Sequence, residues 1–350
     1  MNNPPVEMLL TVASLAFIVA IAWTPLWSKF LYTRGFGKQI RADGNTPLFT
    51  KLHAHKSGTP TMGGFLIWGT VAVIALGLHW LALWQGPDSL FGQLDFLTRQ
   101  QTWLPLALLV MAGVVGMIDD WMNVRGKGAA TGGLSVTHRL MIYTGIALVG
   151  AIWFYYKLGW DFLHVPFFAD VFVGWWYVPL FIFIIVGVAF SVNETDGLDG
   201  LAGGTLLTAF AALGAIAYAQ GKFQLAAFCG CIVGALLAFL WFNIPPARFF
   251  MGDTGAMALG VTLGIVAMLT NTVLLLPVIG LVFLLETLSV IIQVLSKKFR
   301  GKKIFKSAPL HHHLEAIGWP EAKIVMRLWV ISGVTATVGV IMALVDKGLT

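Results

Sequence analysis

Apolar stretches long enough to cross a bilayer recur along this whole chain and constrain its fold more than any other feature. A helix of about 20 apolar residues spans the ~30 Å hydrocarbon core of a membrane. We place ten such stretches at 8–28, 62–84, 102–120, 138–156, 174–192, 201–219, 224–242, 255–270, 272–295 and 327–345. Because only helices and closed barrels satisfy backbone polar groups in lipid, the sequence predicts an all-α integral membrane protein of about ten transmembrane helices.

The composition agrees with a single membrane domain over residues 1–350. Of the 350 residues, 58% are hydrophobic and 11% are charged, against roughly 25% charged in soluble proteins. The start "MNNPPVEMLL" lacks a basic segment, so we expect the first stretch to be a retained span and not a cleaved signal. Cys229 and Cys231 lie within the seventh stretch, where small apolar packing residues are expected in preference to a redox pair.

The basic residues predict an orientation. The loops after the odd-numbered stretches, with their flanking helix ends, hold all of the 22 Lys and Arg residues except Arg99, Lys157, Lys222 and Lys347. Positive charge marks the cytoplasmic side. This face is therefore expected to be cytoplasmic, with both termini outside.

The same face collects the unusual polar residues, which are Asp119, Asp120, Asn193, Asp196, Asp199, Asp253 and the run His311, His312 and His313. Taken singly, each has an ordinary explanation: Asp253 could be a helix N-cap, the aspartate pair could mark a helix end, and the histidines could be a surface loop. Together they favour function, because acids at a membrane boundary are costly. Carboxylate and amide oxygens suit Mg²⁺.

Glycines in "TMGG", "DGLDGLAGG" and "MGDTG" allow a backbone to approach a phosphate closely, although no Walker or dinucleotide pattern is present. Adjacent residues diverge by about 100° on a helix, so Asp119 and Asp120 are expected to serve different partners. The residues predict Mg²⁺-assisted phosphate chemistry at the cytoplasmic face, on a substrate that contacts lipid.

Two other classes of membrane protein also use acidic residues within a helical bundle. A secondary transporter places its acids near the bilayer midplane between inverted repeats, whereas these residues lie at one rim. An intramembrane prenyltransferase needs two aspartate-rich D-x-x-x-D motifs, which "IDDW" and "TDGLD" do not supply.

Six segments resemble one known family in order and spacing. They are "KSGTPTMGG", "IDD", "TDGLDGLAGG", "FNIPPARFFMGDTGAMALG", "ETLSVIIQV" and "IFKSAPLHHHLEAIGWPE". The chain resembles the phospho-N-acetylmuramoyl-pentapeptide transferases, the MraY family, from about Gln39 to Ile331. The histidine run with its trailing Glu and Gly-Trp separates this family from related polyprenyl-phosphate N-acetylhexosamine-1-phosphate transferases, which remain the alternative.

The resemblance implies a multi-pass enzyme of the bacterial inner membrane, usually a homodimer. Its partners would include membrane lipid and no nucleic acid. It would transfer phospho-MurNAc-pentapeptide from UDP-MurNAc-pentapeptide to undecaprenyl phosphate, giving lipid I and UMP with Mg²⁺, the first membrane step of peptidoglycan synthesis. We expect direct attack by the lipid phosphate, because a carboxylate that binds Mg²⁺ is a poor nucleophile.

The resemblance also implies roles for residues. Asp253 would bind Mg²⁺ with Asn193 as its companion, and one of Asp119 and Asp120 would deprotonate or orient the lipid phosphate. His311 would be needed for activity. Substrate contacts are implied for Lys56, Asn193, Asp196, Asp199, Asn243, Phe250, Gln293, His312 and His313, with Phe250 stacking on uracil.

This chain departs from the family pattern at three positions. Asn123 and Gly132 stand where lysines are usual, and Glu194 stands where an apolar residue is usual. We expect Arg125 and Lys127 to supply the missing positive charge.

Overall fold

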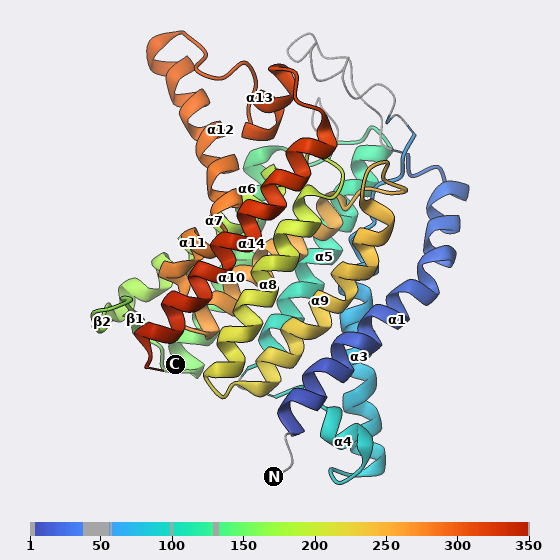
Figure 1. Ribbon diagram of the computed structural model, residues 1–350, viewed down its shortest axis with the longest axis vertical. Helices are drawn as coiled ribbons and strands as arrows, with labels where there is room; N and C mark the ends of the chain where they lie inside the picture. The colour runs from blue at the N-terminus through green and yellow to red at the C-terminus, as the bar shows by residue number, and fades with distance from the viewer. Residues whose placement is uncertain (1–3, 38–55, 57, 99–100, 129–132, 349–350) are drawn as a thin grey trace.

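The computed structural model describes residues 4–37, 56, 58–98, 101–128 and 133–348, and helices dominate it (Figure 1). In that part of the chain nine helices are long and apolar enough to span a membrane, and a bent pair supplies a tenth span. This confirms the all-α membrane fold. The straight spans are α1 (Pro4–Thr33), α3 (Phe65–Gln85), α5 (Trp103–Val124), α6 (Val136–Ile152), α7 (Tyr177–Thr195), α8 (Leu201–Ala219), α9 (Phe223–Asn243), α10 (Gly252–Leu269) and α14 (Glu321–Asp346).

The ninth predicted stretch is a bent span and not one straight helix. It consists of η4 (Val273–Leu275), α11 (Leu276–Ile279) and α12 (Leu281–Arg300). The two parts meet at an angle of 86°. Gly280 sits at the junction with φ −104° and ψ 36°, outside the helical region. As a result α12 leaves the bundle at the top of Figure 1.

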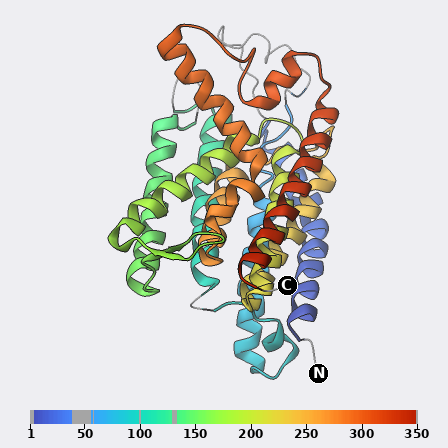
Figure 2. The same ribbon diagram turned by 60° about the vertical axis from the view of Figure 1, so that its left-hand side comes forward.

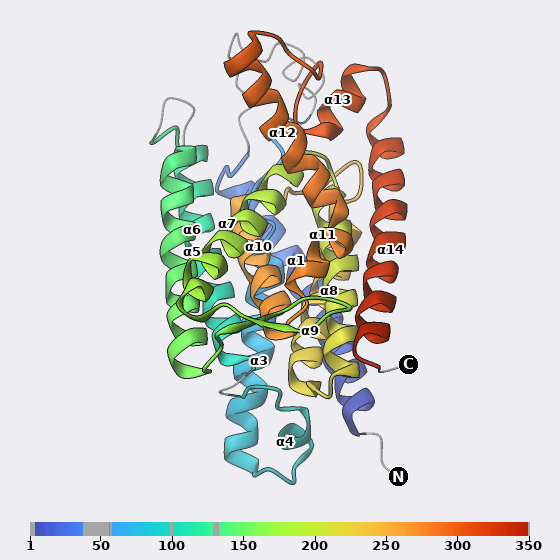
Figure 3. The ribbon, with the colours of Figure 1, turned by 90° about the vertical axis from the view of Figure 1, so that its left-hand side faces the viewer.

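Two short strands interrupt the all-α pattern. β1 (Phe162–His164) pairs antiparallel with β2 (Asp170–Phe172), and the hairpin lies across one end of the bundle (Figures 2 and 3). His164 Nε2 lies 2.5 Å from Asp346 Oδ2 at the end of α14. The same end carries α4 (Leu90–Leu94), η2 (Trp153–Lys157) and η3 (Gly174–Trp176).

Helix α10 is the centre of the bundle, and all of its residues except Asp253 are buried. Small residues let its neighbours approach closely, as is common where membrane helices pack. A Cβ atom at Gly116 of α5 would lie 2.1 Å from the Asp253 carbonyl oxygen, and one at Gly64 would lie 2.1 Å from Gly255 Cα. These contacts fix the first turn of α10 against α5 and against the start of α3.

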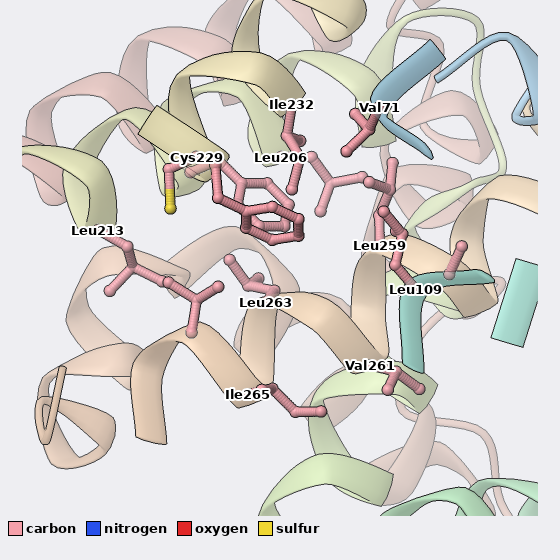
Figure 4. Packing of buried hydrophobic residues seen from close by; sticks show 14 of the residues in the cluster. Val71, Leu109, Leu206, Leu213, Cys229, Ile232, Leu259, Val261, Leu263 and Ile265 are labelled. Carbon is pink, nitrogen blue, oxygen red and sulfur yellow. The ribbon is translucent and has the colours of Figure 1, made fainter. Parts of the chain in front are cut away.

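The core around α10 is formed by residues of α5, α8 and α9, including Leu109, Leu206 and Ile232 (Figure 4). Cys229 and Cys231 are free and fully buried. The prediction that they are packing residues is confirmed.

Both termini lie at one end of the molecule, and α13 (Leu310–Ala316) lies at the other (Figure 1). The predicted polar residues fall at the α13 end, because α5, α7 and α9 end there and α6, α10 and α14 begin there.

Candidate active site

Arg139 connects three of the polar residues at the α13 end of the bundle. Its Nη2 atom lies 2.8 Å from Asp119 Oδ2 and 2.8 Å from Asp253 Oδ2. Its Nη1 atom donates to Asn193 Oδ1 at 3.2 Å, and Asn193 Nδ2 donates to Asp253 Oδ1 at 2.6 Å. Asp119 Oδ1 accepts a hydrogen bond from the Leu134 amide at 2.5 Å. We call Asp119, Arg139, Asn193 and Asp253 the acid cluster.

Asp120 faces a different set of partners, as expected for adjacent residues of a helix. Its Oδ1 atom accepts from Thr61 Oγ1 at 3.0 Å. Its Oδ2 atom accepts from the Thr254 amide at 3.0 Å and from Thr254 Oγ1 at 2.7 Å. Gly252 makes room for this contact, since it has φ +70° and a Cβ atom there would lie 2.4 Å from Asp120 Oδ2. Asp120 therefore caps the start of α10, while the side chain of Asp253 does not.

The segment 193–200, which follows the body of α7, also contributes structural bonds. Asp196 Oδ2 accepts from the Gly252 amide at 3.0 Å. Asp199 Oδ2 accepts from the Ala247 amide at 3.0 Å. These carboxylates hold neighbouring loops in place.

Lys56 forms a buried ion-pair group with Asp199 and Glu321. Its Nζ atom lies 2.7 Å from Asp199 Oδ1 and 2.5 Å from Glu321 Oε1. Glu321 Oε1 also accepts from the Asp199 amide at 2.8 Å. This group ties the start of α14 to the segment 193–200.

His311 is fully buried and paired with Glu286 of α12. Its Nδ1 atom lies 3.0 Å from Glu286 Oε2, and neither side chain is exposed to solvent. The other atoms of the pair, His311 Nε2 and Glu286 Oε1, are buried without a hydrogen-bond partner. A Cβ atom at Gly197 would lie 2.1 Å from Nε2, so the ring packs edge-on against the segment 193–200.

The next two histidines lie on α13 and are partly buried. His312 Nδ1 lies 2.7 Å from Glu315 Oε2. His313 Nδ1 accepts from the Lys306 amide at 3.2 Å. The run thus belongs to a short helix that packs on Glu286 of α12 and on Gly197 after α7, and it is not a free surface loop.

Two residues that were predicted to contact the substrate, Asn243 and Gln293, form side-chain hydrogen bonds with the backbone. Asn243 accepts from the Gly200 amide and donates to the Phe249 carbonyl. Gln293 accepts from the Ile304 and Phe305 amides and donates to the Phe305 carbonyl. Phe250 is partly buried, next to these loops.

The donor set of the acid cluster fits a hard divalent cation. Asp253, Asp119 and Asn193 offer carboxylate and amide oxygens, the class that Mg²⁺ takes. Within the described ranges there is no group of three or more His, Cys, Asp or Glu side chains placed to hold a metal. Mg²⁺ commonly binds through one or two carboxylates and completes its shell with waters and substrate phosphates, so the fit stands.

Comparison with known proteins identifies the family. The family model for glycosyl transferase family 4 matches residues 102–271. A phospho-N-acetylmuramoyl-pentapeptide-transferase of Geobacillus kaustophilus is 41% identical over 341 residues, which cover 96% of this chain and 98% of the relative. One of the same name from Chloroflexus aurantiacus is 39% identical over 349 residues, covering 96% and 89%. The chain belongs to this transferase family. It is a multi-pass protein of a bacterial inner membrane.

Arg125 and Lys127, the expected replacements for the missing family lysines, lie in the loop that follows α5. Arg125 is exposed, and Lys127 Nζ lies 5.4 Å from the centre of the Trp121 ring. Gly132 lies outside the described residues. In the part of the chain that the structure describes, the cation paired with Asp119 and Asp253 is Arg139, which was expected from the sequence only to contribute to orientation.

Glu286 and Glu321 were also missed as site residues. Both could have been recognised from the sequence, because a charged residue within or at the start of an apolar span is costly unless it is paired. Glu194 lies within electrostatic reach of His311, Arg139, Glu286 and Asp253.

Proposed function

We propose that this protein transfers phospho-N-acetylmuramoyl-pentapeptide from UDP to undecaprenyl phosphate, releasing UMP and forming lipid I. The observation that carries the proposal is the acid cluster, in which two aspartates, an asparagine and an arginine from four different helices meet at one end of the bundle. The family relationship supplies the substrates, since its members are named for this transfer.

The transfer exchanges one phosphoanhydride for another, so positioning and charge neutralisation are the main demands on the protein. Asp253 and Asn193 would hold Mg²⁺, with Asp119 beside them. When bound, Mg²⁺ would offset the repulsion between the two anionic substrates and stabilise the leaving UMP. Arg139 adds a fixed positive charge next to the same position.

The other residues build the walls of the site. Asp120 and Asp196 each accept from an amide at the start of α10, and this fixes the Asp253 turn. Lys56, Asp199 and Glu321 hold the segment 193–200 against α14. In this proposal Asp119 orients the lipid phosphate, and the partly buried His312, His313 and Phe250 face the nucleotide and sugar.

The test is a transfer assay with purified full-length protein, UDP-MurNAc-pentapeptide, undecaprenyl phosphate and Mg²⁺, followed by UMP detection. UMP should form only when both substrates and Mg²⁺ are present with the protein, and its formation should stop when EDTA is added. A parallel reaction with UDP-N-acetylglucosamine checks the related hexosamine-phosphate activity. UMP formed from that donor alone would overturn the proposal.

A further inference from the structure

A cavity of about 1250 Å³ lies at the end of the bundle away from the acid cluster. It is bordered by Trp103, which begins α5, and by Leu269, which ends α10. The acid cluster lies at the opposite ends of these same two helices. The cavity is therefore separate from the candidate active site by the length of a membrane span.

The walls of the cavity combine apolar surface with positive charge. Its described lining holds five leucines and the indoles of Trp103, Trp153 and Trp160, together with Lys157 and Lys222, and contains no Asp or Glu. His79, which also lines it, is held by Asp95 at 2.7 Å. Tryptophan and lysine are the residues that proteins place at the level of lipid headgroups.

Two polar atoms at this wall lack a hydrogen-bond partner among the described residues. They are Trp153 Nε1 and Gln101 Oε1, and both residues line the cavity. Lys222 Nζ donates to the Leu269 carbonyl at 2.6 Å. Burial, with the nearby charge of Lys347, lowers the pKa of Lys222 to about 8. Among the described residues Lys222 has no carboxylate partner, and a half-buried ammonium in that state gains from an anion placed beside it.

We propose that this cavity binds the phosphate group of a membrane lipid. Lys157, Lys222 and the Trp153 indole N–H donate to its oxygens, and the leucine and tryptophan walls contact the adjoining part of the lipid chain. A free phosphate would leave most of this volume and its apolar walls unused, because pockets of 300–1,000 Å³ already hold drug-sized molecules.

Two sources of this chemistry exist in a membrane. One is an anionic glycerophospholipid, and the other is a polyprenyl phosphate. The inference does not depend on the proposed transfer activity, since none of its residues belongs to the acid cluster.

The experiment measures lipid binding by native mass spectrometry of the full-length protein in detergent. Phosphatidylglycerol, undecaprenyl phosphate and zwitterionic phosphatidylcholine are titrated separately, each with and without inorganic phosphate. The variant is Lys157→Gln with Lys222→Gln. The matched control is Lys297→Gln with Lys298→Gln, a pair of exposed lysines at the far end of α12.

The double variant should weaken one binding event for an anionic lipid by about fivefold per lysine, and leave phosphatidylcholine unchanged. Loss confined to phosphatidylglycerol, or confined to undecaprenyl phosphate, identifies the source. Equal anionic-lipid affinity in the double variant and the control would overturn the proposal. So would full displacement of the lipid by inorganic phosphate.

Lys157 is exposed, so Lys157→Gln alone keeps the test valid if Lys222→Gln disturbs folding. The transfer assay on the same samples separates the two proposals. Lipid binding can be lost while UMP release continues. If lipid binding is kept and UMP release is lost, the result concerns only the active site.

Discussion

Asp253 is the one residue of α10 that is not buried, and both of its carboxylate oxygens face the acid cluster. We expect Asp253→Asn to reduce UMP release by orders of magnitude while expression and thermal stability change little. The reason is that an amide binds Mg²⁺ far more weakly than a carboxylate, and part of the loss should be recovered by high Mg²⁺ or Mn²⁺ through mass action. Near-normal turnover of this variant at low Mg²⁺ would contradict the metal assignment.

Asp119 and Asp120 are adjacent in sequence but bonded to different elements. Asp120→Asn should lower the thermal unfolding temperature, because an amide cannot accept all three hydrogen bonds from Thr61 and Thr254, and each buried bond lost costs about 1–3 kcal/mol. Asp119→Asn should mainly lower turnover. Thermal unfolding in detergent and UMP release, measured on both variants, test this difference. If both variants show the same change in unfolding temperature and in turnover, the two aspartates do not have separate roles.

Arg139 stands where its charge competes with a bound cation. Its guanidinium contacts Asp119, Asp253 and Asn193 together, so a divalent ion must share or displace these contacts. Arg139→Gln should raise the affinity for Mn²⁺ without substrate by about tenfold or more, since a unit charge within a few ångströms is worth more than ~1 kcal/mol at a protein surface.

Electron paramagnetic resonance of bound Mn²⁺ measures this affinity, and Arg125→Gln is the matched control because Arg125 is exposed in the next loop. The same variant should lose turnover, because the cation beside the phosphates is removed. Mn²⁺ affinity that stays the same or falls in Arg139→Gln would show that Arg139 supports the metal instead of competing with it.

At the scale of elements, α13 is held on α12 by the buried pair of His311 and Glu286. Glu286→Leu should loosen this contact and leave the imidazole nitrogen unpaired, whereas Glu286→Gln keeps an acceptor for it. We expect faster proteolysis between Gly301 and Pro309 and lower turnover in the leucine variant, with partial retention of both properties in the glutamine variant. If both variants are cleaved at the wild-type rate, the pair does not hold α13.

The spans were predictable because each is an uninterrupted apolar run, and a run of that length has few other ways to satisfy its backbone in lipid. The 86° bend at Gly280 was not, since residues 272–295 are apolar on both sides of it and the direction of α12 is set by packing. The hairpin was missed because strands of three residues carry too little alternation to be recognised.

The candidate site, too, could be predicted only in part. Acidic residues at a membrane boundary indicated where the site lies, and the different directions of Asp119 and Asp120 followed from helix geometry alone. The contacts among Arg139, Asn193 and Asp253 could not be predicted. These residues come from three helices, and their meeting depends on the close approach that glycines such as Gly116 allow.

At the scale of the whole molecule, the distribution of charge is the basis for orientation. The end that carries the acid cluster and α13 also carries most of the lysines and arginines, and the opposite end carries both termini, the hairpin and α4. From positive-inside asymmetry we expect the acid cluster to face the cytoplasm, which is where a nucleotide-linked substrate is available.

Cysteine labelling tests this orientation directly, and the protein is suited to it because Cys229 and Cys231 are fully buried and give little background. Asp88, just before α4, and Lys303, just after α12, are exposed. Figure 1 shows α4 and the end of α12 at opposite ends of the molecule. A membrane-impermeant maleimide applied to intact spheroplasts should label Asp88→Cys at once and Lys303→Cys only after permeabilisation. The reverse pattern would place the acid cluster outside the cell, where no UDP-linked donor is supplied, and would overturn the proposed function together with the orientation.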